Sequence, residues 1–297
     1  MKHKKEMYAI IIASVLTGLV GLLVKLIGTE IHPLTLAFYR IAVGGLFLAI
    51  ALPSFDPDFH KPRKGDIKLF AVAGLLLAAS LSSFVFALSI SSVSEVMLIT
   101  STYIFFVAIF ASLFLKEKLK HKHILALILI LIGMFIINPI SSGMSILGLI
   151  IALTNAMIHA GLLVYMKYEG KRHKSSAIVW ILLCATLFLL PAPFIFGFGN
   201  IIKVLPLLLV LGIVSTAVTY TLLSFGLRKI SADSVAILQL SITPITAILL
   251  AIIFLQERLS DRTVIGGTFI LLGGISLIYS LAKFKSFLQE RLHVAPH

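Results

Sequence analysis

Long apolar runs, separated by short polar or basic stretches, occupy the chain almost from end to end. A helix needs about 20 apolar residues to cross the hydrocarbon core of a membrane. The runs have that length and are unbroken, unlike the alternating segments of about ten residues that form membrane barrels. The pattern therefore predicts an all-α membrane protein of about 10 transmembrane helices. The expected spans lie near residues 7–28, 33–52, 67–90, 94–115, 123–138, 146–168, 175–196, 204–227, 234–255 and 263–282.

The composition makes lipid, rather than water, the main solvent of the protein's surface. Hydrophobic residues make up 59% of the 297 residues and charged residues only 12%, and the mean hydropathy is +1.10. A soluble domain carries about 25% charged residues. The net charge of +13 does not indicate a nucleic-acid partner, because the lysines and arginines occur in short clusters between apolar runs.

The basic clusters also predict the orientation of the chain. If the loops are assigned to alternate sides of the membrane, roughly four fifths of the 25 lysines and arginines fall on the side that holds both termini. Basic residues are enriched in cytoplasmic loops. We therefore expect a multi-pass protein of the cytoplasmic (plasma) membrane, with both termini and a tail at residues 283–297 in the cytoplasm.

The second half of the chain restates the first. The sequence Ser-Val-Ser-Glu-Val at 92–96 corresponds to Ser-Ala-Asp-Ser-Val at 231–235, and Phe-Leu-Lys-Glu-Lys-Leu at 114–119 corresponds to Phe-Leu-Gln-Glu-Arg-Leu at 254–259. We expect two five-helix repeats, one over residues 7–138 and the other over residues 146–282. An odd number of helices per repeat places the two repeats in opposite orientations, which is the usual architecture of alternating-access transporters.

These features resemble the EamA-type family of the drug/metabolite transporter superfamily, over residues 8 to 282. The resemblance rests on the two repeats, the Phe-Leu-x-Glu-[Lys/Arg]-Leu motif, Pro33 with Tyr39-Arg40, and Pro244 in the ninth span. The chain departs from internal symmetry at Ile104, where the repeat partner is Pro244, so a kink shared by these two helices is not implied. The resemblance implies an exporter or exchanger of amino acids, nucleotide sugars or other small metabolites, with a central cavity between the halves.

Polar side chains within the expected spans are the candidates for lining that cavity, because exposing them to lipid is costly. Asn155 and His159 share one face of the sixth span, since they are four residues apart. We expect the first, third, fourth, sixth, eighth and ninth spans to surround the cavity and the fifth and tenth to be peripheral. The candidate substrate-binding residues are Ser14, Arg40, Ser83, Tyr103, Asn155, His159, Tyr220, Gln239 and Thr243.

A structural alternative exists for each of these residues. Serine and threonine hydroxyls in membrane helices often bond to backbone carbonyls of their own or a neighbouring helix. Asn155, His159 and Gln239 carry larger desolvation costs, and they would either bind substrate or join helices. Arg40 would hold a substrate carboxylate, or it would pair with Glu30 or Glu95 as a structural strut.

Two acids, Glu95 and Asp233, occupy adjacent positions in the repeat alignment. Either would be able to carry a coupling proton across the membrane. Alternatively, each caps the first turn of its helix, where a carboxylate satisfies free N–H groups and the helix dipole.

A secondary carrier is the function that these features favour. It would move a small polar or amphipathic metabolite, amino acid-like or similar, across the cytoplasmic membrane by alternating access, in export or exchange. The sequence contains no Gly-x-x-x-x-Gly-Lys-[Ser/Thr] loop for ATP, so a gradient or exchange would supply the energy. The alternative is a membrane-embedded transferase acting on a lipid-linked substrate, which needs a general acid or base.

Only 12 acids are present, and no paired carboxylates are expected to face one cavity, which argues against the transferase. We therefore expect no enzymatic activity, no cofactor and no metal site. The expected partners are the small-molecule substrate, the lipid bilayer and, if an acid titrates during transport, coupling protons. A monomer would be sufficient for this function.

Overall fold

The computed structural model describes residues 4–55, 64–115, 146–169, 176–230 and 232–273, together with residues 128, 129, 132, 133 and 136. All regular secondary structure in these residues is helical. Eight of the segments are long and apolar enough to cross a membrane. The predicted class, an all-helical membrane protein, is thereby confirmed.

The eight segments correspond to the first four and the sixth to ninth expected spans. The expected span at 123–138 falls mostly outside the described residues, and the one at 263–282 is described only as far as residue 273, as a helix over 261–273. In chain order the other elements are α1 (Lys4–Ile27), η1 (Gly28–Glu30), α2 (Pro33–Phe55), α3 (Lys64–Ile90), α4 (Val93–Thr100), α5 (Tyr103–Leu115), α7 (Ile146–Glu169), α8 (Ser176–Leu189), α9 (Ala192–Phe196), α10 (Ile201–Leu209), the π-helix η2 (Val210–Val218), α11 (Thr219–Leu227) and α12 (Ala232–Leu255).

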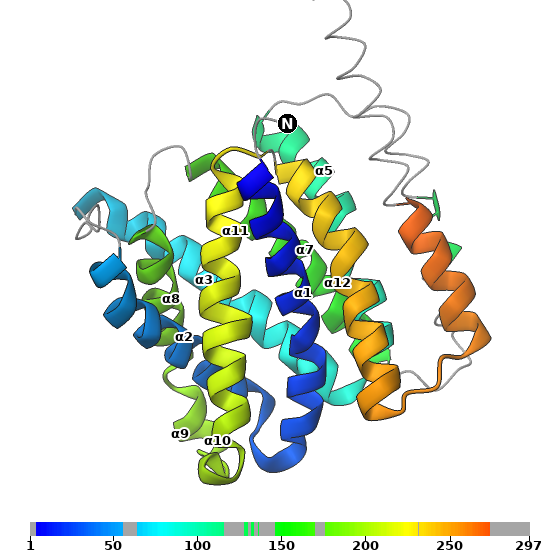
Figure 1. Ribbon diagram of the computed structural model, residues 1–297, viewed down its shortest axis with the longest axis horizontal. Coiled ribbons are helices and arrows are strands. Elements are labelled where there is room, and N and C mark those ends of the chain that lie inside the picture. The colour runs from blue at the N-terminus through cyan, green and yellow to red at the C-terminus, as the bar shows by residue number, and fades with distance from the viewer. Residues whose placement is uncertain are drawn as a thin grey trace, which may run out of the picture.

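The helices pack in two groups that meet along the middle of the molecule. α1 lies along α12 and against α11, so the first and the penultimate spans are neighbours (Figure 1). α3 packs against both α7 and α8, and α5 packs against α7. α2 contacts both α8 and η2, and α4 contacts both α7 and α12, so these two helices join the groups.

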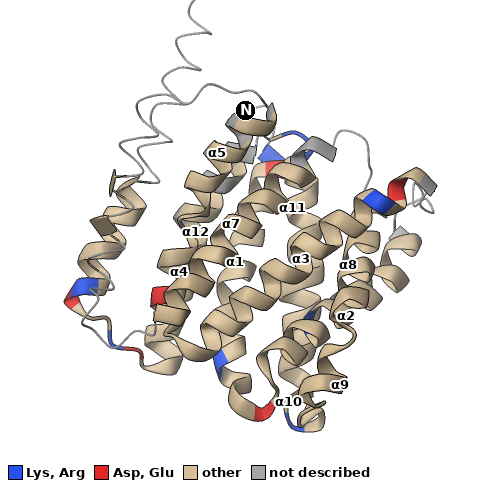
Figure 2. Cartoon of the chain, turned by 180° about the vertical axis from the view of Figure 1, so that it is seen from behind, with Lys and Arg blue, Asp and Glu red and all other residues tan. Residues whose placement is uncertain are grey.

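Most charged residues lie toward the two ends of the bundle, and few lie in the wide zone between them (Figure 2). Large apolar side chains cover the outside of that zone: Ile50 is 77% exposed, Leu113 68% and Ile253 66%. Such exposure is costly in water but favourable in lipid, where no apolar surface needs to be hidden. The outer surface is therefore built to face hydrocarbon.

The fourth span is interrupted between α4 and α5, although it contains no proline. At this point Thr100 Oγ1 donates a hydrogen bond to the Val96 carbonyl at 2.7 Å, and Ser101 Oγ donates to the Met97 carbonyl at 2.6 Å. Hydroxyl groups that bond to carbonyls one turn back compete with the helix's own hydrogen bonds and bend it. Conversely, α12 continues without a break through Pro244.

Two carboxylates from different parts of the chain hold the start of α4. Ser92 Oγ caps α4 by accepting a hydrogen bond from the Glu95 amide at 3.2 Å, and it donates to Glu95 Oε2 at 2.9 Å. Glu257, which follows α12, accepts from the amides of Val93 at 2.9 Å and Ser94 at 3.2 Å, and from Ser94 Oγ at 2.8 Å. Free N–H groups and the helix dipole favour a carboxylate here. We call the contact of Glu257 with Val93 and Ser94 the α4 latch.

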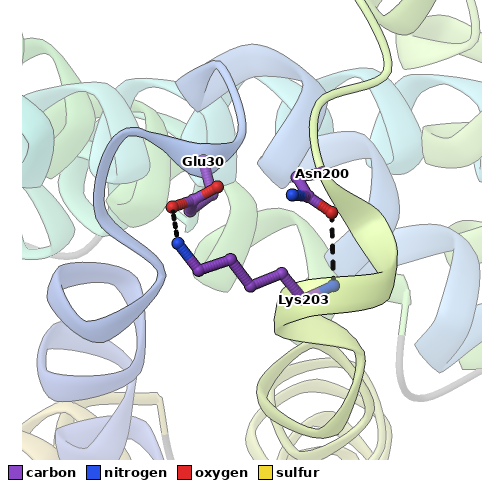
Figure 3. A network of polar contacts seen from close by, with 3 residues as sticks. All are labelled: Glu30, Asn200 and Lys203. Atoms are coloured by element: carbon purple, nitrogen blue, oxygen red, sulfur yellow. Dashed lines mark hydrogen bonds and ion pairs between the residues drawn. The ribbon is translucent and has the colours of Figure 1, made fainter.

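At the same end of the bundle, the turn after α1 contacts the start of α10 (Figures 1 and 3). Lys203 forms an ion pair with Glu30. The Asn200 side chain accepts a hydrogen bond from the Lys203 amide at 3.3 Å, and the Asn200 amide donates to the Glu30 carbonyl at 3.0 Å. Glu30 is therefore engaged with the second half of the chain.

Candidate functional site

A cavity of about 90 Å³ lies between the two groups of helices. The expected first, third, fourth, sixth, eighth and ninth spans all contribute to its wall, and α2 adds Arg40. No described residue of the expected fifth or tenth span lines it. Of the candidate residues, the structure brings seven to this wall: Arg40, Tyr103, Asn155, His159, Tyr220, Gln239 and Thr243.

Ser14 and Ser83 do not line the cavity. Ser14 is fully buried where α1 meets α12, and its Oγ donates to the carbonyl of Ile10 at 2.7 Å. Ser83 Oγ donates to the Ala79 carbonyl at 2.8 Å. Both hydroxyls are thus bonded within their own helices, which is the structural alternative expected for serine in membrane helices.

Arg40 is 3% exposed and is held by the π-helix η2. Its Nε donates to Thr216 Oγ1 at 2.8 Å, and its Nη2 donates to the Ser215 carbonyl at 3.2 Å. Thr216 Oγ1 in turn donates to the Leu211 carbonyl at 2.8 Å. Tyr220 lies close enough to interact electrostatically with the guanidinium. The side chain is therefore anchored along one edge of its planar group.

Neither carboxylate that the sequence suggested as a strut partner binds Arg40. Glu30 pairs with Lys203, and Glu95 accepts a hydrogen bond from Ser92 Oγ at the start of α4. The acceptors of Arg40 among the described residues are a hydroxyl and a carbonyl, both uncharged. The strut interpretation is corrected accordingly: Arg40 joins α2 to η2 through these two uncharged acceptors.

Two glycines allow α2 and η2 to approach closely enough for these bonds. A Cβ atom on Gly44 would lie 2.7 Å from the carbonyl oxygen of Gly212, and one on Gly212 would lie 2.5 Å from Cγ1 of Val43. Small residues at helix contacts in membranes permit such close backbone approach. π-helical segments are rare and occur frequently at functional sites. The glycines and the π-helix together place Arg40 on the cavity wall.

Two buried polar atoms, each on a residue that lines the cavity, have no hydrogen-bond partner among the described residues. They are Nη1 of Arg40 and Oε1 of Gln239, whose side chain is 6% exposed. A buried polar atom without a partner costs about 1–3 kcal/mol, and more when it is charged. Proteins rarely retain such atoms without a reason. Both residues line the cavity, where a polar ligand can satisfy them.

Asn155 connects α7 to α3 at the cavity wall. Its Nδ2 donates to the Ser80 carbonyl at 2.6 Å, and lies 3.3 Å from both Ser80 Oγ and Ser83 Oγ. Its amide nitrogen is therefore occupied by protein acceptors. This arrangement fits the role of joining helices better than the role of donating to a substrate.

The substitution Asn155→Leu should lower the free energy of unfolding by about 1–3 kcal/mol, because it leaves the acceptors on α3 without their donor. The matched control is Thr154→Val, on the exposed face of the same helix, where the hydroxyl bonds only to the Ile150 carbonyl of its own turn. Thermal unfolding of the purified proteins in detergent measures the stability of each variant relative to the wild type. Equal stabilities of the two variants would show that Asn155 does not join the helices.

His159 packs edge-on against Tyr103, with ring centroids 5.2 Å apart and an interplanar angle of 80°. Tyr103 and Phe84 give this side of the cavity an aromatic surface. Edge-to-face contacts of this kind fix ring orientation. The cavity thus combines an aromatic side with the polar atoms of Arg40 and Gln239.

Of the two candidate coupling acids, the structure describes the side chain of Glu95 alone. Glu95 lies in the first turn of α4, where its carboxylate accepts a hydrogen bond from the hydroxyl of Ser92, the residue that caps the helix. The side chain of Asp233 lies outside the described residues. Among the described residues, no group of three or more histidines, cysteines or acids is arranged to hold a metal ion.

The candidate residues from the sequence differ from the wall at several positions. On α1 the structure brings Thr17 to the wall, and not Ser14, three residues before it. The packing of α1 against α12 and α11, including the contact of Gly18 with Thr246, sets the rotation of the helix. The apolar wall residues Leu81, Phe84, Met97, Leu223 and Leu240 carry no polar signal that distinguishes them from lipid-facing residues.

Comparisons with known proteins agree with this architecture. The sequence profile of the EamA-like transporter family matches residues 4–138 and again residues 146–280. An uncharacterized transporter of Archaeoglobus fulgidus is 29% identical over 267 residues, which cover 89% of this chain and 93% of that protein. An uncharacterized transporter of Clostridium kluyveri is 28% identical over 258 residues, with 82% of each chain covered.

A relative with a named cargo is the pseudopaline exporter CntI of Pseudomonas aeruginosa, 25% identical over 183 residues, which cover 61% of this chain and 63% of the exporter. A protein of known crystal structure shares the fold, with a TM-score of 0.69 and 15% identity. The matching region covers 94% of this chain and 98% of that one, so the fold is shared over nearly the whole length.

Proposed function

The chain belongs to the EamA-like transporter family, and on that basis we propose that it is a secondary transporter that moves a small polar or amphipathic metabolite across the cytoplasmic membrane by alternating access. The relatives with named functions are transporters or an exporter, which favours a carrier over the membrane transferase. The named exporter supports export, or exchange with export, as the direction.

The observation that carries this proposal is a cavity among membrane helices with unpartnered polar atoms on its wall. Small-molecule sites are concave and mostly apolar, with a few polar groups that fix the ligand's orientation. The wall also draws residues from both halves of the chain: Arg40 and Tyr103 come from the first, and Asn155, Tyr220 and Gln239 come from the second. A site between two halves can change its access when the halves move.

We further propose ten spans in two inverted repeats, over residues 7–138 and 146–282. The family profile matches the chain twice, in segments that have nearly the same boundaries as these repeats. Five spans per repeat would give the two halves opposite orientations, and thus two related states that open to opposite sides.

The α4 latch is the contact that we expect to change between these states. It ties the segment after α12 to the start of α4, a helix that contacts both α12 and α7. The distribution of the basic clusters favours an outward-facing position for this end of the bundle. The latch would therefore hold the cavity closed on the outer side and release when the cavity opens there.

The orientation can be tested by labelling single cysteines, placed at Arg63, Lys171 or Lys203 in a Cys184→Ser background. An impermeant thiol reagent applied to intact cells should label the cysteine at Lys203 and leave those at Arg63 and Lys171 unlabelled, because basic clusters stay in the cytoplasm. Labelling of all three in broken cells is the control. Labelling at Arg63 but not at Lys203 in intact cells would reverse the proposed orientation.

The proposed function itself is tested with proteoliposomes loaded with an isotope-labelled extract of small metabolites. A subset of metabolites should leave vesicles that contain the protein and stay in vesicles without it, with release that saturates as the concentration rises. Mass spectrometry of the external solution identifies what leaves. If both kinds of vesicle release the same metabolites at the same rate, the protein is not a carrier for them and the proposal fails.

A further inference from the structure

The cavity wall carries a fixed positive charge without a negative one. Among the described residues of the wall, the guanidinium of Arg40 supplies the positive charge, and there is no aspartate or glutamate. The hydrogen bonds that hold Arg40 go to uncharged acceptors. A buried charge that lacks a counter-charge is strongly unfavourable, and an arginine does not relieve the cost by losing its proton. The wall is therefore electrostatically incomplete until an anion enters.

The free part of the guanidinium indicates which anion fits. Nε and Nη2 are anchored to η2, while Nη1 has no partner. The planar guanidinium matches the geometry of a carboxylate or a phosphate. A phosphate monoester carries about −1.5 to −2 charges at neutral pH and would overcompensate a single arginine. One carboxylate balances the charge of Arg40.

The same balance distinguishes two kinds of carboxylate. A zwitterion, such as a free amino acid, would neutralise Arg40 with its carboxylate but bring an ammonium group that finds no acid on the described wall. That ammonium group would lose its hydration water and gain no ionic partner, which is costly in a site of low polarity. A monoanion leaves the occupied cavity neutral.

Gln239 specifies a second group on the ligand. Its Oε1 is an acceptor without a donor among the described residues. A hydroxyl or an amide N–H on the ligand would satisfy it, and neither brings a charge. The aromatic surface of Phe84 and Tyr103 suits an apolar remainder of the molecule.

Resting on the proposed transport function, we propose that the substrate class is small monocarboxylates that carry an uncharged hydrogen-bond donor and an apolar group. The carboxylate binds Nη1 of Arg40, and the donor binds Oε1 of Gln239. Such a ligand satisfies both unpartnered atoms of the wall and balances its charge.

A matched series of four compounds on one carbon skeleton tests this assignment. The compound 2-hydroxy-4-methylpentanoate has the carboxylate and the donor, and 4-methylpentanoate lacks the donor. L-Leucine replaces the hydroxyl by an ammonium group, and 2-hydroxy-4-methylpentanamide has no charge. Titration calorimetry on the purified protein in detergent should show the hydroxy acid binding about tenfold or more tightly than each of the others, the effect of one buried hydrogen bond or ion pair.

Two variants locate the effect on the proposed atoms. Gln239→Leu should remove the advantage of the hydroxy acid over 4-methylpentanoate and keep its advantage over the amide. Arg40→Gln should remove the advantage over the amide. Leu46→Ala, at a position on α2 that is 57% exposed to lipid, is the control and should keep the full order. If Arg40→Gln does not fold, the relative affinities of the four compounds for the wild-type protein and for Gln239→Leu still test the proposal.

The proposal is overturned if L-leucine or the amide binds as tightly as the hydroxy acid, or if none of the four compounds binds. The metabolite-release experiment keeps this result separate from the proposed function. Release of zwitterionic or neutral metabolites, together with failure of the hydroxy acid, removes the substrate assignment and leaves the transporter. Absence of any release removes the transporter itself.

Discussion

Arg40→Lys should reduce transport by about 100-fold or more, the effect of losing roughly 3 kcal/mol of charge-assisted hydrogen bonding to the substrate. A lysine keeps the charge but replaces the planar fork by one nitrogen. That nitrogen cannot bond to Thr216 and Ser215 and also offer the donors that Nη1 offers to the cavity. Transport of a metabolite identified by the release experiment, measured in proteoliposomes beside thermal unfolding, gives both effects.

The matched control for Arg40→Lys is Thr216→Val, which removes the acceptor of Nε but leaves the guanidinium and its charge in place. It should lower stability more than it lowers transport, because it breaks the join between α2 and η2. If Arg40→Lys transports at a nearly normal rate, the guanidinium does not hold the substrate. If Arg40→Lys loses no more transport than Thr216→Val at an equal loss of stability, the role of Arg40 is structural.

Gly44→Ala should destabilise the protein severely and abolish transport. The added Cβ would lie 2.7 Å from the carbonyl oxygen of Gly212, a backbone atom that can move only if the whole helix moves. Overpacking of this kind typically costs about 1–3 kcal/mol, even where flexible side chains can adjust. Separation of α2 from η2 would also pull Arg40 from its acceptors. The midpoint of thermal unfolding and the transport rate measure the two consequences.

Gly161→Ala is the control for Gly44→Ala, because both glycines lie inside membrane helices. A Cβ on Gly161 has no contact closer than 3.7 Å, to a ring carbon of Phe110. The alanine should be tolerated, and it should stabilise the helix by up to about 1 kcal/mol through its higher helix propensity. Equal behaviour of the two variants would contradict the close packing of α2 on η2.

The sequence predicted the helical class because spans of this length need only a count of apolar residues. It also predicted much of the cavity wall: Asn155, His159, Gln239 and Thr243 are polar in otherwise apolar helices, and the structure brings them to one space. A polar side chain inside a span avoids lipid and faces the protein interior or a cavity, so its position in the sequence indicates which face of the helix is buried.

Other features depend on contacts that no local pattern reveals. The carboxylate of Glu257 bonds to Val93 and Ser94, which lie far away in the chain. The break between α4 and α5 likewise has no proline in its span that would predict it. For Ser14, the amphipathic argument fails because an apolar helix with few polar residues leaves its rotation undetermined.

We propose that transport requires the α4 latch to open. This requirement is tested most directly with Ser94→Cys and Glu257→Cys combined in a Cys184→Ser background, bridged by a short bifunctional methanethiosulfonate. Ser94 Oγ and Glu257 Oε2 are 2.8 Å apart, so a short bridge can join these positions. Each single cysteine, treated in the same way, is the control.

Bridging should stop the release of metabolites from proteoliposomes, and a reducing agent should restore release to the rate of the unbridged protein. The bridge would hold the outer side closed, so the cavity would exchange its contents with one side only. Transport at an undiminished rate through fully bridged protein would contradict the account, because the cavity would then not need the latch to open.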